Sequence, residues 1–407
     1  MARQNMRLKY LCSSFSTPIM QQEVLDSGTY AVYGASGKVG YLNNFCCKEP
    51  YLGIVKDGAG VGRINQYNGE TSLLGTMAYL VPNNGVNINW LKYAIMTLDL
   101  GNDVGKTTIP HIYFSDYGNR VVWYVPMEQQ IQIADFLDRR CAEIDAVIER
   151  TRATIEEYKK LKQAVITEAV TKGIRGSRPM MDSGIEWIGE IPVGWLLLRI
   201  TRILDYSHPY PIGDGDHGLV KTEDYGTSGI PYIRVQNVGW ATPLDLSTVV
   251  YITPEINEKI KNSILRPGDV LFAKTGATIG KTAIVPDDLP ISNTTSHVGK
   301  ITVDPRYSAK YVFYLLSSFV GYKQFWDIAC QKTTRPELSI DETKSIRVLL
   351  PSERSEQDEI VAYLDEKTFA IDTLIRKKEQ YLSELDNLKK AVIYEYVTGK
   401  KEVPVCQ

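Results

Sequence analysis

The sequence predicts an α+β protein: two mixed α/β globular units, each followed by a long helix, with the two helices paired as an antiparallel coiled coil of pseudo-two-fold symmetry. The prediction rests on an internal repeat, on a long uninterrupted helical pattern at the end of each copy, and on short β-rich runs ahead of each helix. With 407 residues, 43% hydrophobic and 23% charged, the chain has the size and composition of a soluble globular protein of two or three domains.

The repeat is clearest in the two helical segments, 134–173 and 361–400, which align without a gap at an offset of 227 residues. Leu137–Asp138 matches Leu364–Asp365, for example, and the match continues to the ends of both segments. Neither segment contains Pro or Gly until a glycine near its end, which is a typical helix stop. The sequence therefore predicts two equivalent long helices.

Seam positions recur in both helices at spacings of three and four, the pattern of a coiled-coil seam. Matching sequence, length and stop signals favour an intramolecular pair over two unrelated surface helices. Thr151 and Lys378 are the polar positions in the pattern. The predicted seam consists of Ile144, Ile148, Ile155, Tyr158, Leu161 and Val165 in the first helix and Ile371, Ile375, Leu382, Leu385, Leu388 and Val392 in the second.

The segments ahead of the helices also correspond, more loosely. Residues 51–67 align with 270–285, and WLKYAIM aligns with AKYVFYL through Lys92–Tyr93 and Lys310–Tyr311. KTTIPHI likewise aligns with KTTRPEL. We therefore expect a first globular unit at 1–125, a first helix at 126–174, a linker at 175–195, a second globular unit at 196–350, a second helix at 351–400 and a tail at 401–407.

The stretch FAKTGATIGKTAIV, residues 272–285, raises the alternative of an ATPase. Its glycines are one residue too close for a P-loop, and the β-branched residues and prolines that follow argue against the helix that a P-loop requires. The first copy has Arg63–Ile64 in place of Lys281–Thr282. Both copies share a glycine-flexed turn with a cation on each side, which favours close approach to a phosphate backbone.

Composition narrows the remaining classes. The six cysteines form no C-x-x-C pair and the four histidines lie far apart, so no metal site is expected. No apolar run is long enough to span a bilayer, and the N-terminal sequence lacks a secretory pattern, so a cytoplasmic location without a membrane partner is expected. The net charge of −2 neither indicates nor excludes a nucleic-acid partner.

In combination, several segments resemble the specificity subunits of type I restriction–modification systems over essentially the whole chain. They are YGASGKVGYL (33–42), SGIEWIGEIPVGW (183–195), IGDGDHG (212–218), IPYIRVQNV (230–238), LRPGDVLFAKTGATIGKTAIV (265–285) and both helices through EQQIQIADFLD (128–138) and EQDEIVAYLD (356–365). The first unit departs from the pattern, because it lacks the IGEIP-x-x-W lead-in that precedes the second.

The resemblance implies a non-catalytic subunit that reads double-stranded DNA. Each globular unit would be a target recognition domain for one half of a bipartite site, and the helices would fix the spacing and dock two methyltransferase subunits. No cofactor is expected in this chain. S-adenosylmethionine, ATP and Mg are expected on partner subunits, which include two restriction subunits where the system has a nuclease.

The predicted phosphate contacts lie in the glycine turns and in the KTT clusters, because lysines and hydroxyls suit phosphate oxygens. The alternative is a tight turn with solvated cations. The turn residues are Lys56, Gly58, Arg63, Lys274, Thr275, Thr278 and Lys281, and the cluster residues are Lys106, Thr107, Thr108, Lys332, Thr333, Thr334 and Arg335. Arg335 has the alternative of reading guanine bidentately.

Candidate base contacts lie in IRVQNV, where strand alternation would place Arg234 and Gln236 on one face. Their side chains and that of Asn237 have bidentate geometry for guanine or adenine, and a hydrogen-bonded sheet edge is the alternative. The first unit contributes the DNA-contact candidates Tyr33, Ser36 and Lys38, and the second adds His217, for which a structural role is the alternative.

Two competing functions remain. A stand-alone methyltransferase or nuclease would be an enzyme, but the sequence lacks both an N-P-P-[FY] motif and a Rossmann-type glycine turn. An assembly scaffold or inhibitor would use the same two domains to bind protein rather than DNA. Salt-dependent DNA binding separates this second alternative from the specificity subunit.

Overall fold

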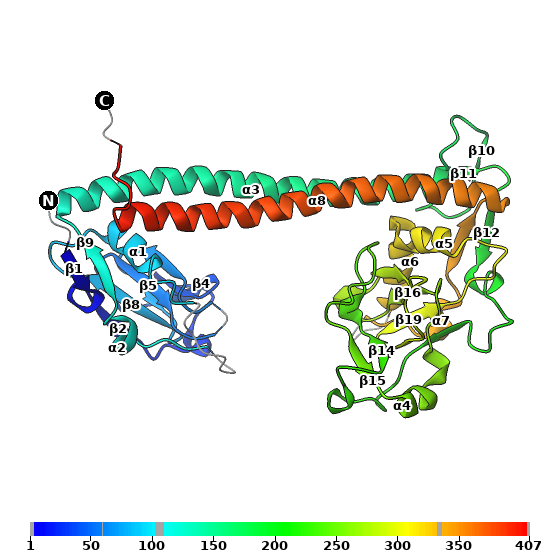
Figure 1. Ribbon diagram of the computed structural model, residues 1–407, viewed down its shortest axis with the longest axis horizontal. Coiled ribbons are helices and arrows are strands. Elements are labelled where there is room, and N and C mark those ends of the chain that lie inside the picture. The colour runs from blue at the N-terminus through cyan, green and yellow to red at the C-terminus, as the bar shows by residue number, and fades with distance from the viewer. Residues whose placement is uncertain (1–3, 59, 102–109, 332–335, 405–407) are drawn as a thin grey trace. The chain divides into compact units, whose positions relative to one another are not determined.

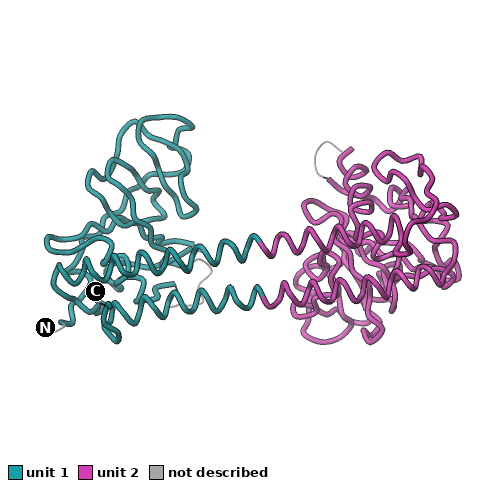
Figure 2. Tube along the Cα trace, turned by 90° about the horizontal axis from the view of Figure 1, so that it is seen from above, with its two compact units in different colours: residues 1–153, 378–407 teal, residues 154–377 magenta. Residues whose placement is uncertain are grey.

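The computed structural model describes residues 4–58, 60–101, 110–331 and 336–404. The chain forms two compact units, unit 1 (residues 1–153 and 378–407) and unit 2 (residues 154–377), as Figure 2 shows. The long helices α3 (Met127–Lys172) and α8 (Arg354–Val397) each contribute to both units (Figure 1). Each unit also has its own β-rich domain, so the predicted α+β class with two long paired helices is confirmed.

Unit 1 contains three small sheets. Their orders are β1-β9, β2-β8-β5-β6 and β4-β3-β7, and every pair is antiparallel except β3 with β7. The elements before α3 are β1 (Gln4–Arg7), β2 (Cys12–Ser16), β3 (Tyr30–Gly34), β4 (Gly37–Leu42), β5 (Tyr51–Val55), β6 (Ile64–Tyr67), β7 (Ser72–Leu73), β8 (Met77–Pro82), α1 (Ile88–Met96), α2 (Phe114–Tyr117) and β9 (Val121–Tyr124).

Unit 2 repeats these three sheets and adds a hairpin, β10-β11. The repeated orders are β12-β20, β13-β19-β16-β17 and β15-β14-β18, with β14 and β18 as the parallel pair. The elements are β10 (Met180–Asp182), β11 (Glu190–Pro192), β12 (Leu196–Arg199), β13 (Ile212–Asp214), β14 (Ile230–Ile233), β15 (Val250–Ile252), α4 (Pro254–Lys259), β16 (Val270–Ala273), β17 (Thr282–Ile284), β18 (Asn293–Thr294), β19 (Val298–Ile301), α5 (Ala309–Ser317), α6 (Phe319–Ala329), α7 (Ile340–Thr343) and β20 (Arg347–Leu350).

The two long helices run antiparallel within each unit. In unit 1, Asp145 of α3 binds Lys389 of α8 at 2.7 Å, and Ile144 and Ile148 pack on Leu385. In unit 2, Lys162 of α3 binds Asp372 of α8 at 2.8 Å. The offset of 227 residues relates the two ion pairs, so each is the pseudo-symmetric counterpart of the other.

Part of the predicted seam is wrong. Leu161 and Leu388 are each 48% exposed, and the next residues, Lys162 and Lys389, turn toward the partner helix in their place. An α-helix has 3.6 residues per turn, so a strict pattern of threes and fours drifts around the helix surface unless the pair supercoils to follow it. Ile144 and Ile148 pack with Leu385 and the half-buried Leu382 across the pair. Ile155, Ile371 and Ile375 are buried and Tyr158 is half-buried, while the half-buried Val165 and Val392 pack against the cores of the two units.

A buried glutamine attaches each β-rich domain to the start of its long helix. In unit 1, the Gln130 side chain accepts from the Asn87 backbone N–H and donates to the Val125 carbonyl, both at 2.8 Å. In unit 2, the Gln357 side chain accepts from the Ser308 N–H at 2.8 Å and donates to the Pro351 carbonyl at 2.9 Å. Because Asn87 and Ser308 are the N-caps of α1 and α5, these contacts fix a short helix on each long one.

An aspartate two turns further along strengthens the attachment. The Tyr93 hydroxyl donates to Asp138 and the Tyr314 hydroxyl donates to Asp365, each at 2.6 Å. Burial, followed by these hydrogen bonds, raises the pKa of both tyrosines and keeps them protonated as donors. We call Gln130 with Asp138, and Gln357 with Asp365, the helix anchors.

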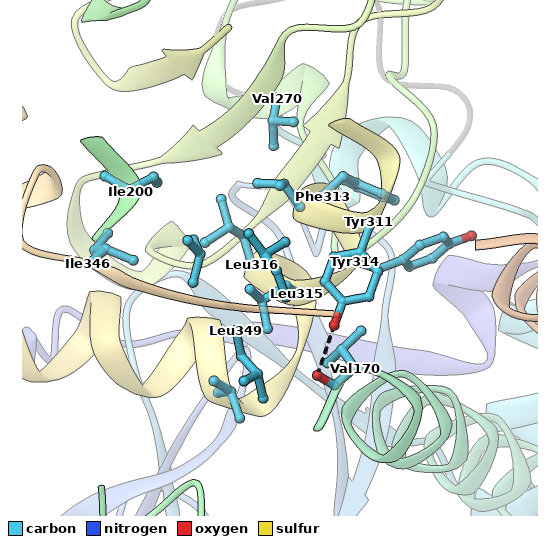
Figure 3. Packing of buried hydrophobic residues seen from close by; sticks show 14 of the residues in the cluster. Val170, Ile200, Val270, Tyr311, Phe313, Tyr314, Leu315, Leu316, Ile346 and Leu349 are labelled. Atoms are coloured by element: carbon cyan, nitrogen blue, oxygen red, sulfur yellow. Dashed lines mark hydrogen bonds between the residues drawn. The ribbon is translucent and has the colours of Figure 1, made fainter. Parts of the chain in front are cut away.

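The helix anchors correct the predicted alignment of the two copies. The structural counterpart of Tyr93 is Tyr314 rather than Tyr311, so the register between α1 and α5 is three residues away from the one that the sequence suggested. The KY dipeptides matched by coincidence within two helices of similar composition. Tyr311 instead donates to the Val170 carbonyl of α3 at 3.1 Å, inside the core of unit 2 (Figure 3).

That core joins α5, β20 and the end of α3. Leu315 and Leu316 of α5 pack with Leu349 of β20 and Val170 of α3, as Figure 3 shows. The same cluster includes Ile191 and Trp195, so the segment predicted as a linker contains a hairpin that is packed into unit 2.

We expect Gln357→Ala to lower the free energy of unfolding of unit 2 by about 2–5 kcal/mol, because it leaves the Ser308 N–H and the Pro351 carbonyl buried without partners. Gln130→Ala should do the same in unit 1, and the exposed Gln132→Ala is the matched control. Urea unfolding followed by tryptophan fluorescence measures the change. Equal, small shifts for all three variants would show that the glutamines do not hold the domains.

Candidate nucleic-acid interface

In both units the glycine turn is hydrogen-bonded to the segment that follows the KTT cluster. The Gly58 N–H donates to the Pro110 carbonyl at 3.0 Å, and the Ile112 N–H donates to the Lys56 carbonyl at 3.0 Å. In unit 2 the same ladder runs from Gly276 to Pro336 at 2.9 Å and from Leu338 to Lys274 at 2.8 Å. The structure thus joins each glycine turn to the residues that follow a KTT cluster in the sequence.

The turns need glycine because four of their residues have left-handed backbone angles. Gly58 and Gly62 have φ of 86° and 83°, and Gly276 and Gly280 have φ of 57° and 88°. Above Gly62 passes the backbone of Gly101, whereas Gly280 is covered by the Tyr322 ring. The turn conformation is therefore shared, but its surroundings differ between the units.

Cationic side chains flank both turns. Arg63 is exposed, and Lys56 and Lys281 are half-buried. None of the three forms an ion pair with another residue in the described part of the chain. Such cations are available to an anionic ligand.

The prediction that Lys274 contacts phosphate is wrong. It is only 2% exposed, and its ammonium pairs with Asp214 of β13 inside the sheet. A buried charge needs a partner of opposite sign, and this one has it internally. Thr275 is also buried, while Thr278 is half-buried and donates to the Thr275 carbonyl at 2.7 Å.

His217 shares the carboxylate that Lys274 binds. Its Nε2 lies 3.2 Å from Asp214 Oδ2, while the side chain is 68% exposed. The buried Lys274–Asp214 pair therefore holds an exposed imidazole beside the glycine turn of unit 2. The sequence pointed to His217 as a candidate DNA contact, but Asp214 was not predicted as its partner. The position of Asp214 three residues earlier, in the same GDGDHG segment, could have indicated it.

The IRVQNV segment differs from the predicted strand. Strand β14 ends at Ile233, and Val235–Asn237 form a 3-10 turn. Asn237 is fully buried, accepting from the Arg234 N–H at 2.8 Å and donating to the Asp245 carbonyl at 2.7 Å, so it is not a base contact. A buried asparagine whose amide group forms hydrogen bonds within the protein stabilises the turn and has no amide group free to bind a ligand.

Arg234 and Gln236 both reach Thr248, although neither lies in a strand. The Arg234 guanidinium donates to the Thr248 carbonyl at 2.6 Å, and the exposed Gln236 amide lies 3.2 Å from the Thr248 hydroxyl. Gln236 keeps free hydrogen-bonding capacity at the surface, whereas Arg234 is partly used within the fold.

In unit 1 the corresponding candidates form a hairpin. Tyr33 lies on β3 with its ring 4.7 Å from that of Tyr67, and Ser36 and Lys38 are exposed at the tip. The Lys38 ammonium lies 3.8 Å from the centre of the Tyr41 ring. The KTT residues Lys106, Thr107, Thr108, Lys332, Thr333, Thr334 and Arg335 lie outside the described residues.

Two contacts near the turns were missed from sequence. In unit 1 His111 pairs with Asp57, next to the shared backbone ladder, and the centre of the His111 ring lies 4.0 Å from that of Tyr113, with the two rings tilted by 50°. Unit 2 has Thr275 and Glu337 at the same bridge. A histidine and an aspartate thus occupy these two positions in unit 1, where unit 2 has a glutamate and a threonine, a difference that a single-copy motif search does not reveal.

The structure decides the ATPase alternative. Residues Thr282–Ile284 form strand β17, so the helix that a P-loop requires is not present after Lys281. Among the described residues no cluster of His, Cys, Asp and Glu is arranged to bind a metal ion, and no helix is long and apolar enough to span a membrane.

Comparison with known proteins agrees with this architecture. A family model described as the type I restriction modification DNA specificity domain matches residues 217–384. The type I restriction enzyme MjaVIII specificity subunit of Methanocaldococcus jannaschii is 25% identical over 358 residues, covering 86% of this chain and 79% of that protein. The EcoBI specificity subunit of Escherichia coli is 26% identical over 306 residues, covering 73% and 62%.

A solved chain also shares the fold. It comes from work on the complex assembly and conformational transition of the type I R-M system, with a TM-score of 0.63, 15% identity and coverage of 97% of both chains. The chain is thus similar in sequence, over most of its length, to the specificity subunits of type I restriction–modification systems, the non-catalytic components of those enzymes, and its residues 217–384 match their DNA specificity domain.

Proposed function

We propose that each β-rich domain reads one half of a bipartite site in double-stranded DNA, and that α3 and α8 dock two methyltransferase subunits. The observation that carries the proposal is the repeated glycine turn, joined in both units to the segment after the KTT cluster and flanked by cations without ion-pair partners in the described chain. A duplicated backbone-binding device suits a duplex whose two strands are related by pseudo-two-fold symmetry.

The partners supply the chemistry in this proposal. Methyltransferase subunits bring S-adenosylmethionine and modify adenine N6, and restriction subunits, where present, bring ATP and Mg. The complex acts in the cytoplasm, where its DNA is. The decisive experiment is to map modified adenines after co-expression of this chain with its methyltransferase subunit; two half-sites at a fixed spacing are expected. Absence of DNA binding, with salt-independent protein binding instead, would favour a scaffold or inhibitor.

Lys281→Ala and Arg63→Ala should weaken binding to all duplexes alike, because their expected contacts are phosphates. The slope of log affinity against log salt should become shallower by about 0.9 for each lost contact. The exposed Lys160→Ala on α3 is a charge-matched control that should change neither quantity. Sequence-dependent losses in fluorescence-anisotropy titrations would contradict a backbone role.

Lys274→Ala is informative as a contrast. It leaves Asp214 buried without its partner, so we expect a fold destabilised by about 3–5 kcal/mol rather than a selective loss of phosphate binding.

Gln236→Ala should relax preference at one half-site only, at about 1–3 kcal/mol, if its exposed amide reads a base bidentately. Arg234→Ala should give the smaller change in DNA discrimination, because its guanidinium already donates to the Thr248 carbonyl. Titration of both variants against duplexes altered in either half-site measures the effect. Equal losses on matched and mismatched duplexes would remove these residues from base reading.

Because α3 and α8 each contribute to both units, they are expected to set the distance between half-sites. Inserting four residues at Glu156 and at Lys378, which faces it in the register of the two ion pairs, lengthens both helices by roughly 6 Å while preserving the pairing on either side. We expect unchanged half-sites separated by one or two additional base pairs, because each step is about 3.4 Å. Methylation mapping reports the spacer, and an unaltered spacer at full activity would show that the helices do not determine it.

A further inference from the structure

Unit 2 has an apolar groove between α8, α5 and the loops of its β-rich domain, with a volume of about 740 Å³. Its lining includes the buried Phe313 and Val285 and the half-buried Leu244 and Pro286. Phe369 of α8 stands at its edge with 69% of its surface exposed. A large exposed aromatic residue beside a hollow is characteristic of a binding surface.

The rim of the groove is acidic. Asp287 and Glu366 are exposed there, Glu366 with the Lys367 ammonium 3.9 Å away. Two further carboxylates line the groove, those of Asp365 and Asp372, which bind Lys310 and Lys162 respectively, so the four carboxylates outnumber the three lysines that contact them. This rim repels a phosphate backbone and attracts lysine or arginine. DNA is therefore a poor occupant, and a peptide with basic flanks is a good one.

The internal repeat provides a control for this surface. At the offset of the long helices, Phe369 and Glu366 correspond to Ala142 and Arg139 of unit 1. In the register fixed by the helix anchors, Phe313 corresponds to Lys92. Unit 1 therefore has a small side chain and two cations where unit 2 has two aromatic rings and an acid.

We propose that the groove of unit 2 is a one-sided docking site for a segment of one methyltransferase subunit, apolar at its centre and flanked by lysine or arginine. The inference rests on the proposed function, which places two copies of that subunit along the helices. A contact made equally by both copies requires surfaces repeated in both units. Asp365 and Asp372 recur in unit 1 as Asp138 and Asp145, but Phe313, Phe369 and Glu366 occur once, so the groove gives only one of the two copies an additional anchor.

The size of the effect follows from Phe369. Burying an exposed phenylalanine against an apolar surface, together with attraction to the acidic rim, corresponds to roughly ten- to hundredfold in affinity. The two methyltransferase copies should thus bind with unequal affinity. Phe369→Ala combined with Glu366→Arg, which gives α8 the residues of α3 at these positions, should make the two binding steps equal.

The test uses the full chain with the methyltransferase subunit of its own system. Titration calorimetry should give two steps that differ by tenfold or more for the natural chain and by less than threefold for the double variant. The matched variant Arg139→Glu in unit 1 should preserve the difference. Equal steps in the natural chain, or unequal steps that persist in the double variant, would overturn the proposal.

Site-specific photo-crosslinking identifies the occupant. With benzoylphenylalanine in place of Phe369, irradiation should attach a methyltransferase peptide containing lysine or arginine, whereas the same residue in place of Ala142 should attach none. Equal crosslinks at both positions, crosslinks to a second copy of this chain, or none at Phe369 in a complex with both subunits bound would each overturn it.

DNA binding by the isolated double variant distinguishes a failure of the proposed DNA-reading function from a failure of the one-sided groove. Its affinity should equal that of the natural chain, because neither residue belongs to the proposed DNA interface. If neither protein binds DNA, the proposed function fails; if both bind and the docking steps are equal in the natural chain, only the one-sided groove fails.

Discussion

The structure depends on the helix anchors, the buried glutamine and the tyrosine-bound aspartate near the start of each long helix. Gln357 is 1% exposed and satisfies one donor and one acceptor of the adjoining β-rich domain. Buried polar groups tolerate little displacement, since a lost hydrogen bond leaves its partner desolvated. The anchor therefore sets the position of each domain on its helix more narrowly than apolar packing alone would. Its exact recurrence at Gln130 makes the two units structural copies despite their low sequence similarity.

The backbone framework is common to the two units, whereas the side chains around it differ, and the two facts have different physical causes. The sheet orders, the glycine turns and the ladder to the segment after each KTT cluster recur, because backbone hydrogen bonds tolerate changes of side chain. The side chains around that framework diverge. Asp57 and His111 pair in unit 1 where unit 2 has Thr275 and Glu337. The two domains therefore combine a common backbone framework with different surfaces.

The sequence was sufficient for the fold class, the long paired helices and the rejection of a P-loop, because periodicity and glycine and proline placement are local properties. It was insufficient where tertiary contacts decide. Burial of Lys274 depends on Asp214, sixty residues away in the chain, and burial of Asn237 depends on a turn that replaces the end of a strand. Leu161 is exposed rather than in the seam, because positions spaced by threes and fours rotate gradually around the surface of a helix with 3.6 residues per turn. The KTT clusters lie outside the described residues, so their predicted role remains a prediction.

The separation of anchor from surface has an evolutionary consequence. Tyr314 and the N-cap Ser308 attach unit 2 to its helix, while Gln236 and the glycine turn lie elsewhere on the domain. A recombination event that exchanged the segment between the linker hairpin and α8 for another with the same tyrosine and N-cap would retain the attachment and change the surface. A new surface can thus arise in one genetic step, without the intermediate loss of folding that gradual substitution in a buried network would impose.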